Sequence, residues 1–500
     1  YHIYYIMYRL LTPTVHQLPL PRVEKASERV EKAQLFLVHA QNDLKEASDY
    51  QDKAQQLLKQ HKIINLETIS KWMPANSTVD ALSMVLHSTP LKQVDQDPAK
   101  VSILKSRNYN VVLPGNVTPS NQMYSGRCWM FAGLNILRRL LILQHDLKPD
   151  FELSQSYLFF WHYFEQYNEM LNLFFYKKEM PEAEKLEWLG KPLHDGGNWV
   201  TFRRLSRKYG VVPKKAYRES WPSSHSSEMN TILCQLLQND LLRCHKFTNE
   251  DDFVSFRDDR LQQVLHILCS CMGTPPMNEY LISLKTSKDM PLQLKATPRS
   301  LIEMLDNPIH IDQHIQIIHD PRAKNITWHK TQHQDLQAVP ELFLNVSDMH
   351  QICKAVTVSI AAGRGVWFAC NMNEDVSPTE QGMACGLYRP DKFIPPGSKE
   401  NGNNLNMTKI DRMNWGRARC NHAMLIVGVE TDPQGVPKSF KIENSWGTGG
   451  PGNGFYKMTA DWFHEHVYTV VIHRDIILSA GISISPQEKI AEYPYYDIFG

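Results

Sequence analysis

The chain has 500 residues, 54 Lys plus Arg against 53 Asp plus Glu, and a net charge of +1. At about 100–200 residues per domain, this length allows about three domains. The balanced charge gives no support for a nucleic-acid-binding protein, and no apolar run of about 18 residues predicts a transmembrane helix. Nine cysteines are an odd and sparse set, so a disulfide scaffold is not expected. These properties are typical of a soluble protein in a reducing compartment.

The first part of the chain changes character twice. Residues 1–20 begin with an apolar, aromatic segment without a small-residue cleavage site, so no signal peptide is predicted. Residues 21–62 are rich in Ala, Glu, Lys, Gln and Leu, and their apolar positions alternate three and four residues apart. This is the pattern of a heptad helix, with Ala at each d position from Ala26 to Ala54. The helix is interpreted either as a coiled-coil or docking helix or as a surface helix of its own domain.

The rest of the chain divides into a helical half and a strand-rich half. Helical patterns dominate the first, and short β-like runs dominate after about residue 355. Residues between the two halves are interpreted as a helical insertion. The expected segments are the apolar start 1–20, the heptad helix 21–62, a connection 63–110, the helical half 111–224, the insertion 225–350, the strand-rich half 351–489 and a C-terminal arm 490–500.

A cysteine opens the most apolar helical pattern of the chain. The segment QMYSGRCW leads into a helix predicted to begin at Cys128 and to stay apolar as far as Arg138. A thiolate at a helix N-terminus is stabilised by unpaired N–H groups and by the positive end of the helix dipole. Such a helix is expected to be buried, with a nucleophile at its exposed end. The alternative is an inert buried cysteine, the commonest state of a free thiol.

Two later motifs complete a catalytic pattern. His422 begins the apolar run HAMLIVGV, predicted to be a buried strand, and Asn444 ends a second strand in IENSWG. Taken singly, these two residues are interpreted as a structural histidine and a turn residue. In the order Cys, His, Asn they fit nucleophilic acyl transfer. Cys128 is then the nucleophile, His422 the acid and base, and Asn444 the residue that orients the imidazole.

Residues beside these three fit the same mechanism. Gln122 lies six residues before Cys128 and is expected to donate its side-chain N–H to the oxyanion, together with the Cys128 backbone N–H. Trp446 is expected to cover the bond between imidazole and amide from water. Trp129, next to the nucleophile, is grouped with it as a supporting residue.

These motifs resemble those of papain-like cysteine peptidases. The Gln-to-Cys spacing, NHAMLIVGV and IENSWG all match, while the separation of 294 residues from Cys128 to His422 is about twice the papain-type separation. An insertion is therefore expected. The segments FELSQSYLFFW, DGGNWVTFRRLSRKYGVVPKK and ADWFHEHVYTVVIHR are similar to the bleomycin hydrolase family, the self-compartmentalised aminopeptidase branch. The resemblance runs from about residue 100 to the C-terminus.

The resemblance implies an α+β, papain-like cysteine peptidase fold, with a helical half, a β-barrel-like half and a helical insertion. The N-terminal heptad helix is an extra element that this family is not expected to have. It implies a cytoplasmic, cofactor-free aminopeptidase that forms a homohexamer, acts on peptides with a free N-terminus and can hydrolyse amides such as that of bleomycin. No metal site and no membrane association are expected. Gly196 and Gly197 are expected to let the substrate backbone approach at the cleft wall, although a simple turn is the alternative. The C-terminal arm is expected to lie in the cleft, with a terminal carboxylate near Gly500 that holds the substrate amine.

Two alternatives stay open. A papain-like endopeptidase with an open cleft is favoured if the arm is short at Gly500. A catalytically vestigial assembly protein would use the helix at 21–62, although an intact Cys, His, Asn and Gln set argues against it. Other motifs are weaker: the Gly-rich segment 447–454 lacks the Lys-Ser/Thr ending of a phosphate loop, and Cys269 with Cys271 has no paired zinc spacing.

Overall fold

The structure is a computed structural model of the chain. It describes residues 77–323, 327–331, 342–389, 393, 407–484, 490–493 and 497–499, with isolated residues between 38 and 73. Two compact units comprise residues 1–88 and 89–500. Among the helices in these ranges, none is both long and apolar enough to cross a membrane.

The first unit contains the helix α4 (Ser77–Leu86). Most of the heptad segment 21–62, and all of residues 1–20, lie outside the described residues. The few described positions of that segment, among them Leu44 and Tyr50, are helical and exposed. A coiled-coil or docking role for 21–62 therefore stays a prediction.

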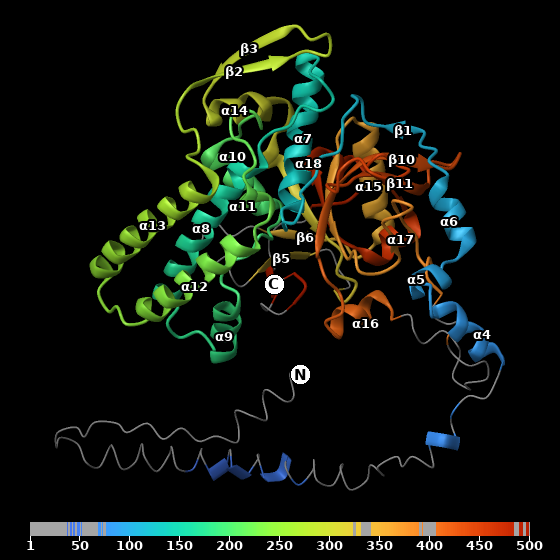
Figure 1. Cartoon of the computed structure of the whole chain (residues 1–500), viewed down its shortest axis with the longest axis horizontal. Coiled ribbons are helices and arrows are strands. Elements are labelled where there is room, and N and C mark those ends of the chain that lie inside the picture. The colour runs from blue at the N-terminus through green and yellow to red at the C-terminus, as the bar shows by residue number, and fades with distance from the viewer. Residues whose placement is uncertain are drawn as a thin grey trace. The chain divides into compact units, whose positions relative to one another are not determined.

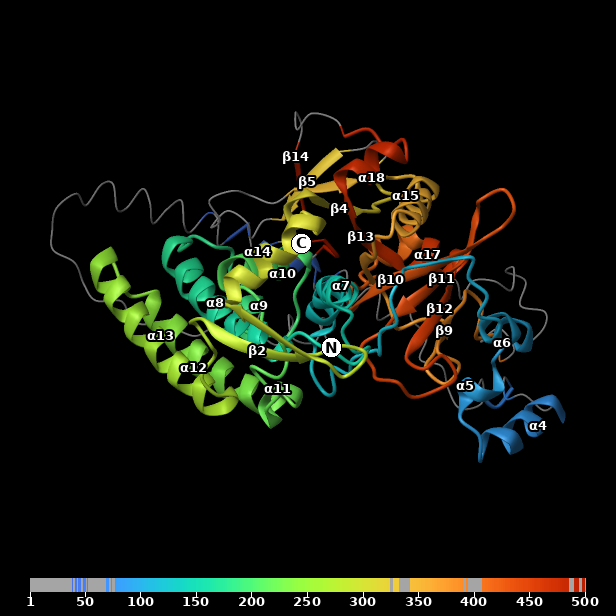
Figure 2. The same ribbon diagram turned by 90° about the horizontal axis from the view of Figure 1, so that it is seen from above.

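The first part of the second unit is mainly helical. The helices are α5 (Leu91–Val94), α6 (Pro98–Lys105), α7 (Cys128–His145), α8 (Gln155–Tyr176), α9 (Glu182–Gly190), α10 (Trp199–Tyr209), α11 (Trp221–Ser224), α12 (Ser227–Cys244) and α13 (Glu250–Met272). Polar residues fix where some of them start: the Ser154 hydroxyl accepts from the Tyr157 N–H at 3.1 Å, and Asn198 accepts from the Thr201 N–H at 3.0 Å. Figures 1 and 2 show α7 between α8, α12 and α13 on one side and the strands on the other.

The strand-rich half is built on one large sheet. Its described strands run in the order β14-β5-β6-β4-β13-β7-β10-β11-β12-β9-β8, with β1 paired to β10, while β2 and β3 form a separate hairpin. The strands are β1 (Val111–Val112), β2 (Tyr280–Lys285), β3 (Pro291–Ala296), β4 (His314–Ile318), β5 (Thr327–Thr331), β6 (Phe343–Asn345), β7 (Val366–Cys370), β8 (Val376–Ser377), β9 (Gly382–Met383), β10 (His422–Thr431), β11 (Pro437–Glu443), β12 (Phe455–Thr459), β13 (Val467–His473) and β14 (Ile490–Tyr493). The later helices are α14 (Pro298–Ile309), the short η1 (Ile311–Gln313), α15 (Met349–Ala361), α16 (Lys409–Asn414), α17 (Ala460–His466) and α18 (Arg474–Ser479).

The centre of this sheet is buried on both faces. In β7, Trp367 and Ala369 pack into the core that contains α7, whereas Phe368 and Cys370 pack into the core that contains α15. Successive side chains of a strand point to opposite faces, so one strand serves both cores. β10 runs antiparallel to β7 and β11, with His422 opposite Cys370. The predicted strand at HAMLIVGV is therefore confirmed, and His422 stands at its first residue.

The prediction of a helical insertion over 225–350 is wrong in its second part. The second of its two long helices, α13, ends at Met272, and the rest contains five strands as well as α14. β4 pairs with β13 and β6, so the large sheet begins before residue 351. These strands are only three to six residues long. β4 pairs with β13, which lies about 150 residues later in the chain, so the local sequence does not indicate this pairing.

A buried ion-pair cluster joins α7 to the end of β11. Arg138 and Arg139, which were expected to mark the end of the buried helix, are themselves buried, and Glu443 is 1% exposed. Glu443 accepts hydrogen bonds from Arg138 at 3.2 Å and from Arg139 at 2.5 Å. Arg138 also donates to the Ser120 hydroxyl at 2.7 Å. This cluster fixes the helix that carries Cys128 against the strand that leads to Asn444.

Replacing Glu443 with Gln tests this cluster. The substitution leaves two buried guanidinium groups without their counter-charge, so we expect a loss of about 3–5 kcal/mol of stability in urea unfolding. The control is Glu279→Gln, which removes the partner of Lys295 in an exposed pair, with an expected loss below about 1 kcal/mol. Equal, small losses in both variants would contradict the structural role given to Glu443.

Candidate active site

The proposed nucleophile stands where the sequence predicts it. Cys128 is the first residue of α7, and its side chain is buried. Arg127, the residue before the helix, makes no side-chain cap hydrogen bond, and the Trp129 backbone N–H of the first turn interacts with the thiol. The Ala423 backbone N–H donates to Cys128 Sγ at 3.4 Å. The start of β10 therefore meets the start of α7 at the sulfur atom.

His422 and Asn444 complete the arrangement. His422 Nε2 lies 2.8 Å from Asn444 Oδ1, and the same oxygen accepts from the Ser445 backbone N–H at 2.8 Å. An amide oxygen only accepts hydrogen bonds, so Nε2 is the donor and the other ring nitrogen is left for Cys128. The three side chains come from the ends of α7, β10 and β11.

The electrostatics favour charge separation in this pair. Burial raises the pKa of the Cys128 thiol, but the neighbouring His422 and the backbone N–H groups of Ala423 and Trp129 more than offset this, and the pKa lies below its ordinary value. Burial lowers the pKa of His422, whereas Cys128 and Asn444 raise it, so that it lies above its ordinary value. Each partner stabilises the charged form of the other. The pair is arranged as a thiolate and an imidazolium.

Gln122 lies beside the nucleophile in the same cavity. Its side-chain oxygen accepts from the Ser445 hydroxyl at 2.5 Å, and its side-chain nitrogen donates to the Ser125 carbonyl at 2.6 Å. The Gln122 backbone N–H also donates to the Ser445 carbonyl at 2.8 Å. A primary amide has two N–H donors, so one remains for a ligand.

Trp446 and Trp129 are the two aromatic residues expected to support the site. The Trp446 ring lies 5.0 Å from the His422 ring, centroid to centroid. Trp129 Nε1 donates to the Asp195 carbonyl at 2.8 Å. A Cβ on Gly197 would lie 2.6 Å from the Trp129 ring, whereas one on Gly196 would meet only His194. Gly197 is therefore required by the packing of Trp129, in addition to lining the cavity with Gly196.

Sequence reasoning missed Asp195, which holds the nucleophile loop. Its carboxylate accepts from the Gly126 backbone N–H at 2.7 Å, from Tyr163 at 2.6 Å and from the Ser226 hydroxyl at 2.5 Å. These three donors come from the Cys128 loop, from α8 and from the residue before α12. The only signal in the sequence is an acidic residue directly before the two glycines of HDGGNW.

The catalytic cavity has a volume of about 790 Å³. Cys128, His422 and Gln122 line it, and so do Ile498 and Phe499 from the C-terminal segment. The predicted arm therefore reaches the cleft. Gly500 lies outside the described residues, so its role stays a prediction.

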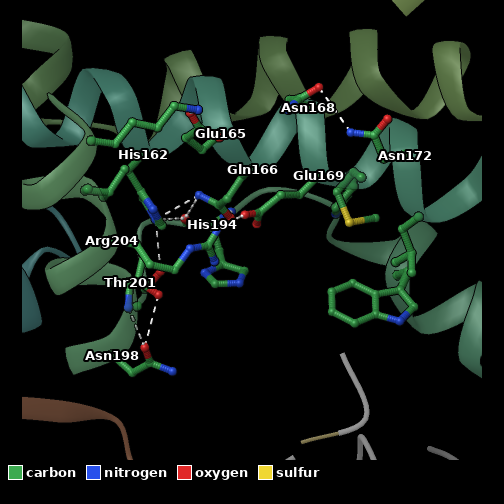
Figure 3. A pocket seen from close by; sticks show the side chains of 18 of the residues that line it. His162, Glu165, Gln166, Asn168, Glu169, Asn172, His194, Asn198, Thr201 and Arg204 are labelled. Carbon is green, nitrogen blue, oxygen red and sulfur yellow. Dashed lines mark hydrogen bonds and ion pairs between the residues drawn. The ribbon is translucent and has the colours of Figure 1, made fainter. Parts of the chain in front are cut away.

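A second cavity of about 940 Å³ lies between α8 and α10 and shares the HDGGNW loop with the first. Figure 3 shows His162 and Gln166 of α8 directed at the part of this loop that contains His194. His162 Nε2 lies 3.0 Å from the Gly196 carbonyl, and Gln166 donates to the His194 carbonyl at 2.9 Å. The cleft wall is thus held by α8 on the side away from Cys128.

Known proteins show the same organisation. A sequence model of the Peptidase C1-like family matches residues 61–500. Aminopeptidase C of Listeria monocytogenes is 30% identical over 86% of this chain and 96% of its own length. Human bleomycin hydrolase is 28% identical over 76% of this chain and 85% of its own length. The crystal structure of PepW from Lactobacillus rhamnosis HN001 superposes with a TM-score of 0.77 at 24% identity, covering 86% of this chain and 97% of that one.

The solved structure confirms the predicted papain-like fold, and the family match covers most of the chain, including Cys128, His422 and Asn444. The chain belongs to the Peptidase C1-like family and is a cysteine-type aminopeptidase of that family.

Proposed function

We propose that this enzyme is an aminopeptidase of the bleomycin hydrolase type, which removes N-terminal residues of peptides through a thioester. The observation that carries the proposal is the position of Ile498 and Phe499 in the cavity of Cys128 and His422. Side chains that occupy one end of a cleft leave no room for a substrate chain on that side. A peptide then reaches Cys128 only with its free N-terminus.

The C-terminal segment is held by polar contacts before it reaches the cavity. Tyr493 donates to the Asp320 carboxylate at 2.8 Å, and Arg322 forms an ion pair with Asp497 at 2.8 Å. Phe499 packs in a small core with Tyr493. These contacts hold the described residues 490–493 and 497–499 of the segment, as an arm that restricts the cleft requires.

The residues around the thiol fit each step of the reaction. The Cys128 thiolate attacks the peptide carbonyl, and the resulting oxyanion accepts hydrogen bonds from the Cys128 backbone N–H and the remaining N–H of Gln122. His422 gives its proton to the leaving amine, and the C–N bond breaks to leave a thioester. Water then attacks the thioester with His422 as the base, which releases the carboxylic acid and restores the thiolate. Asn444 keeps the imidazole in line throughout.

Location and assembly belong to the same proposal. All nine cysteines are free, which supports a reducing compartment such as the cytoplasm. The homohexamer and hydrolysis of the bleomycin amide stay predictions from the family. The endopeptidase alternative is disfavoured by the occupied cleft, and the vestigial alternative by the aligned Cys128, His422 and Asn444.

Paired substrates test the requirement for a free amine. We expect aminoacyl coumarylamides to be cleaved at least about 100-fold faster than their N-acetylated forms, since a site built for a polar group rejects analogues that lack it. A variant that ends at Asp497 should lose this preference and cleave blocked substrates. The control is Ile490→Ala, an exposed position of β14. If the parent cleaves both substrate forms equally, the endopeptidase alternative is correct.

The ion pair predicts how alkylation of Cys128 depends on pH. The Cys128 pKa is lowered and the His422 pKa is raised, so the thiolate–imidazolium pair exists at pH values between these two pKa values. Below the Cys128 pKa the thiolate is protonated. Above the His422 pKa the imidazolium loses its proton, which leaves a thiolate beside a neutral imidazole. Iodoacetamide should therefore label Cys128 well below the ordinary thiol pKa of about 8.5. Burial raises the pKa of Cys244 to about 12, so that buried thiol is the internal control in the mass spectrum. Labelling of Cys128 only near its ordinary pKa would contradict the ion pair.

Gln122→Ala tests the oxyanion donor. We expect kcat to fall about 10²–10³-fold with little change in KM, because the lost hydrogen bond forms mainly in the transition state. Alkylation of Cys128 should keep its rate and pH profile, since the thiol does not depend on that donor. A kcat within about threefold of the parent would exclude Gln122 from the oxyanion site.

A further inference from the structure

Three side chains that bind metals in other proteins meet far along the chain from the catalytic cysteine. Asp375 precedes β8, Cys385 follows β9, and His466 is the last residue of α17. One ligand atom from each lies within 4.8 Å of the other two. The site belongs to the strand-rich half, where Figure 2 shows β9 and α17 on the opposite side of α7 from α8 and α12.

His466 is the most informative member, because it is buried without a hydrogen-bond partner. Its residue is 3% exposed, and Nδ1 has no partner among the described residues. Leaving a buried polar atom unsatisfied costs about 1–3 kcal/mol. The Trp462 ring packs against the imidazole at 4.9 Å, centroid to centroid.

The carboxylate is held in place by the loop that carries the cysteine. Asp375 accepts from the Gly386 backbone N–H at 2.8 Å and from the Tyr388 backbone N–H at 3.2 Å. The Asp375 carbonyl also accepts from the Ala384 N–H at 3.2 Å. Metal-binding carboxylates are typically oriented by such outer hydrogen bonds. The loop therefore presents Asp375 and Cys385 to the same point.

We propose that Asp375, Cys385 and His466 bind a zinc ion. Carboxylate, thiolate and imidazole are the three ligand types of protein zinc sites, and ligands of one tetrahedral zinc lie roughly 3.3–3.8 Å apart. Small side-chain rotations bring atoms now within 4.8 Å to these separations. Zinc replaces the thiol proton of Cys385, which passes to solvent, and the carboxylate and thiolate together balance its two charges. Water completes the fourth position.

The surroundings permit this ion to enter and stay. Asp375 and Cys385 are each part-exposed, which gives a path from solvent. Two cations act on His466, and both have partners: Arg412 pairs with Glu465 at 2.7 Å, and Lys409 donates to the Val467 carbonyl at 2.6 Å. The bound ion would join α17 to the loop after β9 and act on stability. It has no place in the reaction at Cys128.

Cobalt binding tests the site in the full chain. The protein carries Cys128→Ala, so that the catalytic pair cannot supply a thiolate, and is first dialysed against a chelator. We expect one equivalent of Co²⁺ to give tetrahedral visible bands with a thiolate charge-transfer band in the near ultraviolet, and Zn²⁺ to displace it. Metal analysis gives the stoichiometry. Zn²⁺ should also raise the thermal unfolding midpoint of this protein.

Matched variants assign the ligands. Cys385→Ser should abolish the charge-transfer band and the thermal shift, and His466→Gln should weaken binding at least tenfold. The control is Cys353→Ser, because Cys353 Sγ lies 3.5 Å from His464 Nε2 in a second Cys–His pair without a carboxylate, and it should bind as the parent does. Unfolding of the metal-free variants shows that each folds. A thiolate band that survives Cys385→Ser, or the absence of any such band in the parent, would overturn the proposal.

Discussion

The chemistry of this enzyme depends on a contact between two side chains that are 294 residues apart in sequence. Proton transfer between Cys128 and His422 requires their atoms to stay within hydrogen-bond reach. The thiol is fixed to the first residue of a helix and the imidazole to the first residue of a strand. Such ends are held to tenths of an ångström only where both elements are buried. The burial of α7 against β10 and β7 is therefore the condition for the site.

Charged residues fix the position of the buried helix α7 along its axis. Apolar contacts hold a helix in a core but do not set its position along its axis, because the hydrophobic effect is non-directional. The pairing of Arg138 and Arg139 with Glu443 sets that position, one residue before Asn444. Desolvation makes such a cluster weak evidence for net stability, since apolar replacements are often as stable. The position of this cluster beside Asn444 therefore explains it better than a contribution to the free energy of unfolding does.

The positions of the proposed catalytic residues could be predicted because each lies at or next to the end of a regular element with a strong local pattern. Cys128 opens an apolar helix and His422 a continuous apolar strand, so sequence alone places both in the core. Asp195 could not be found this way, because its role arises from donors on three separate segments. The strands within 280–345 were missed for a related reason, since distant pairing and not local alternation makes β4 to β6 into strands. Contacts between remote segments leave little trace in a single sequence.

The groups around Cys128 and Cys385 differ in charge, and this difference separates the two chemistries proposed for these thiols. Beside the catalytic pair stands the neutral amide of Asn444, which accepts from the imidazolium and adds no negative charge near the thiolate. Beside Cys385 stands the carboxylate of Asp375, and burial together with nearby carboxylates raises the pKa of that thiol. A Cys385 thiolate beside the Asp375 carboxylate is therefore unfavourable unless a cation is bound. A thiol that loses its proton only with a cation present acts as a metal ligand and not as a nucleophile. Burial and the carboxylates of Asp461 and Asp375 oppose a thiolate at Cys385, whereas His422 stabilises the thiolate at Cys128.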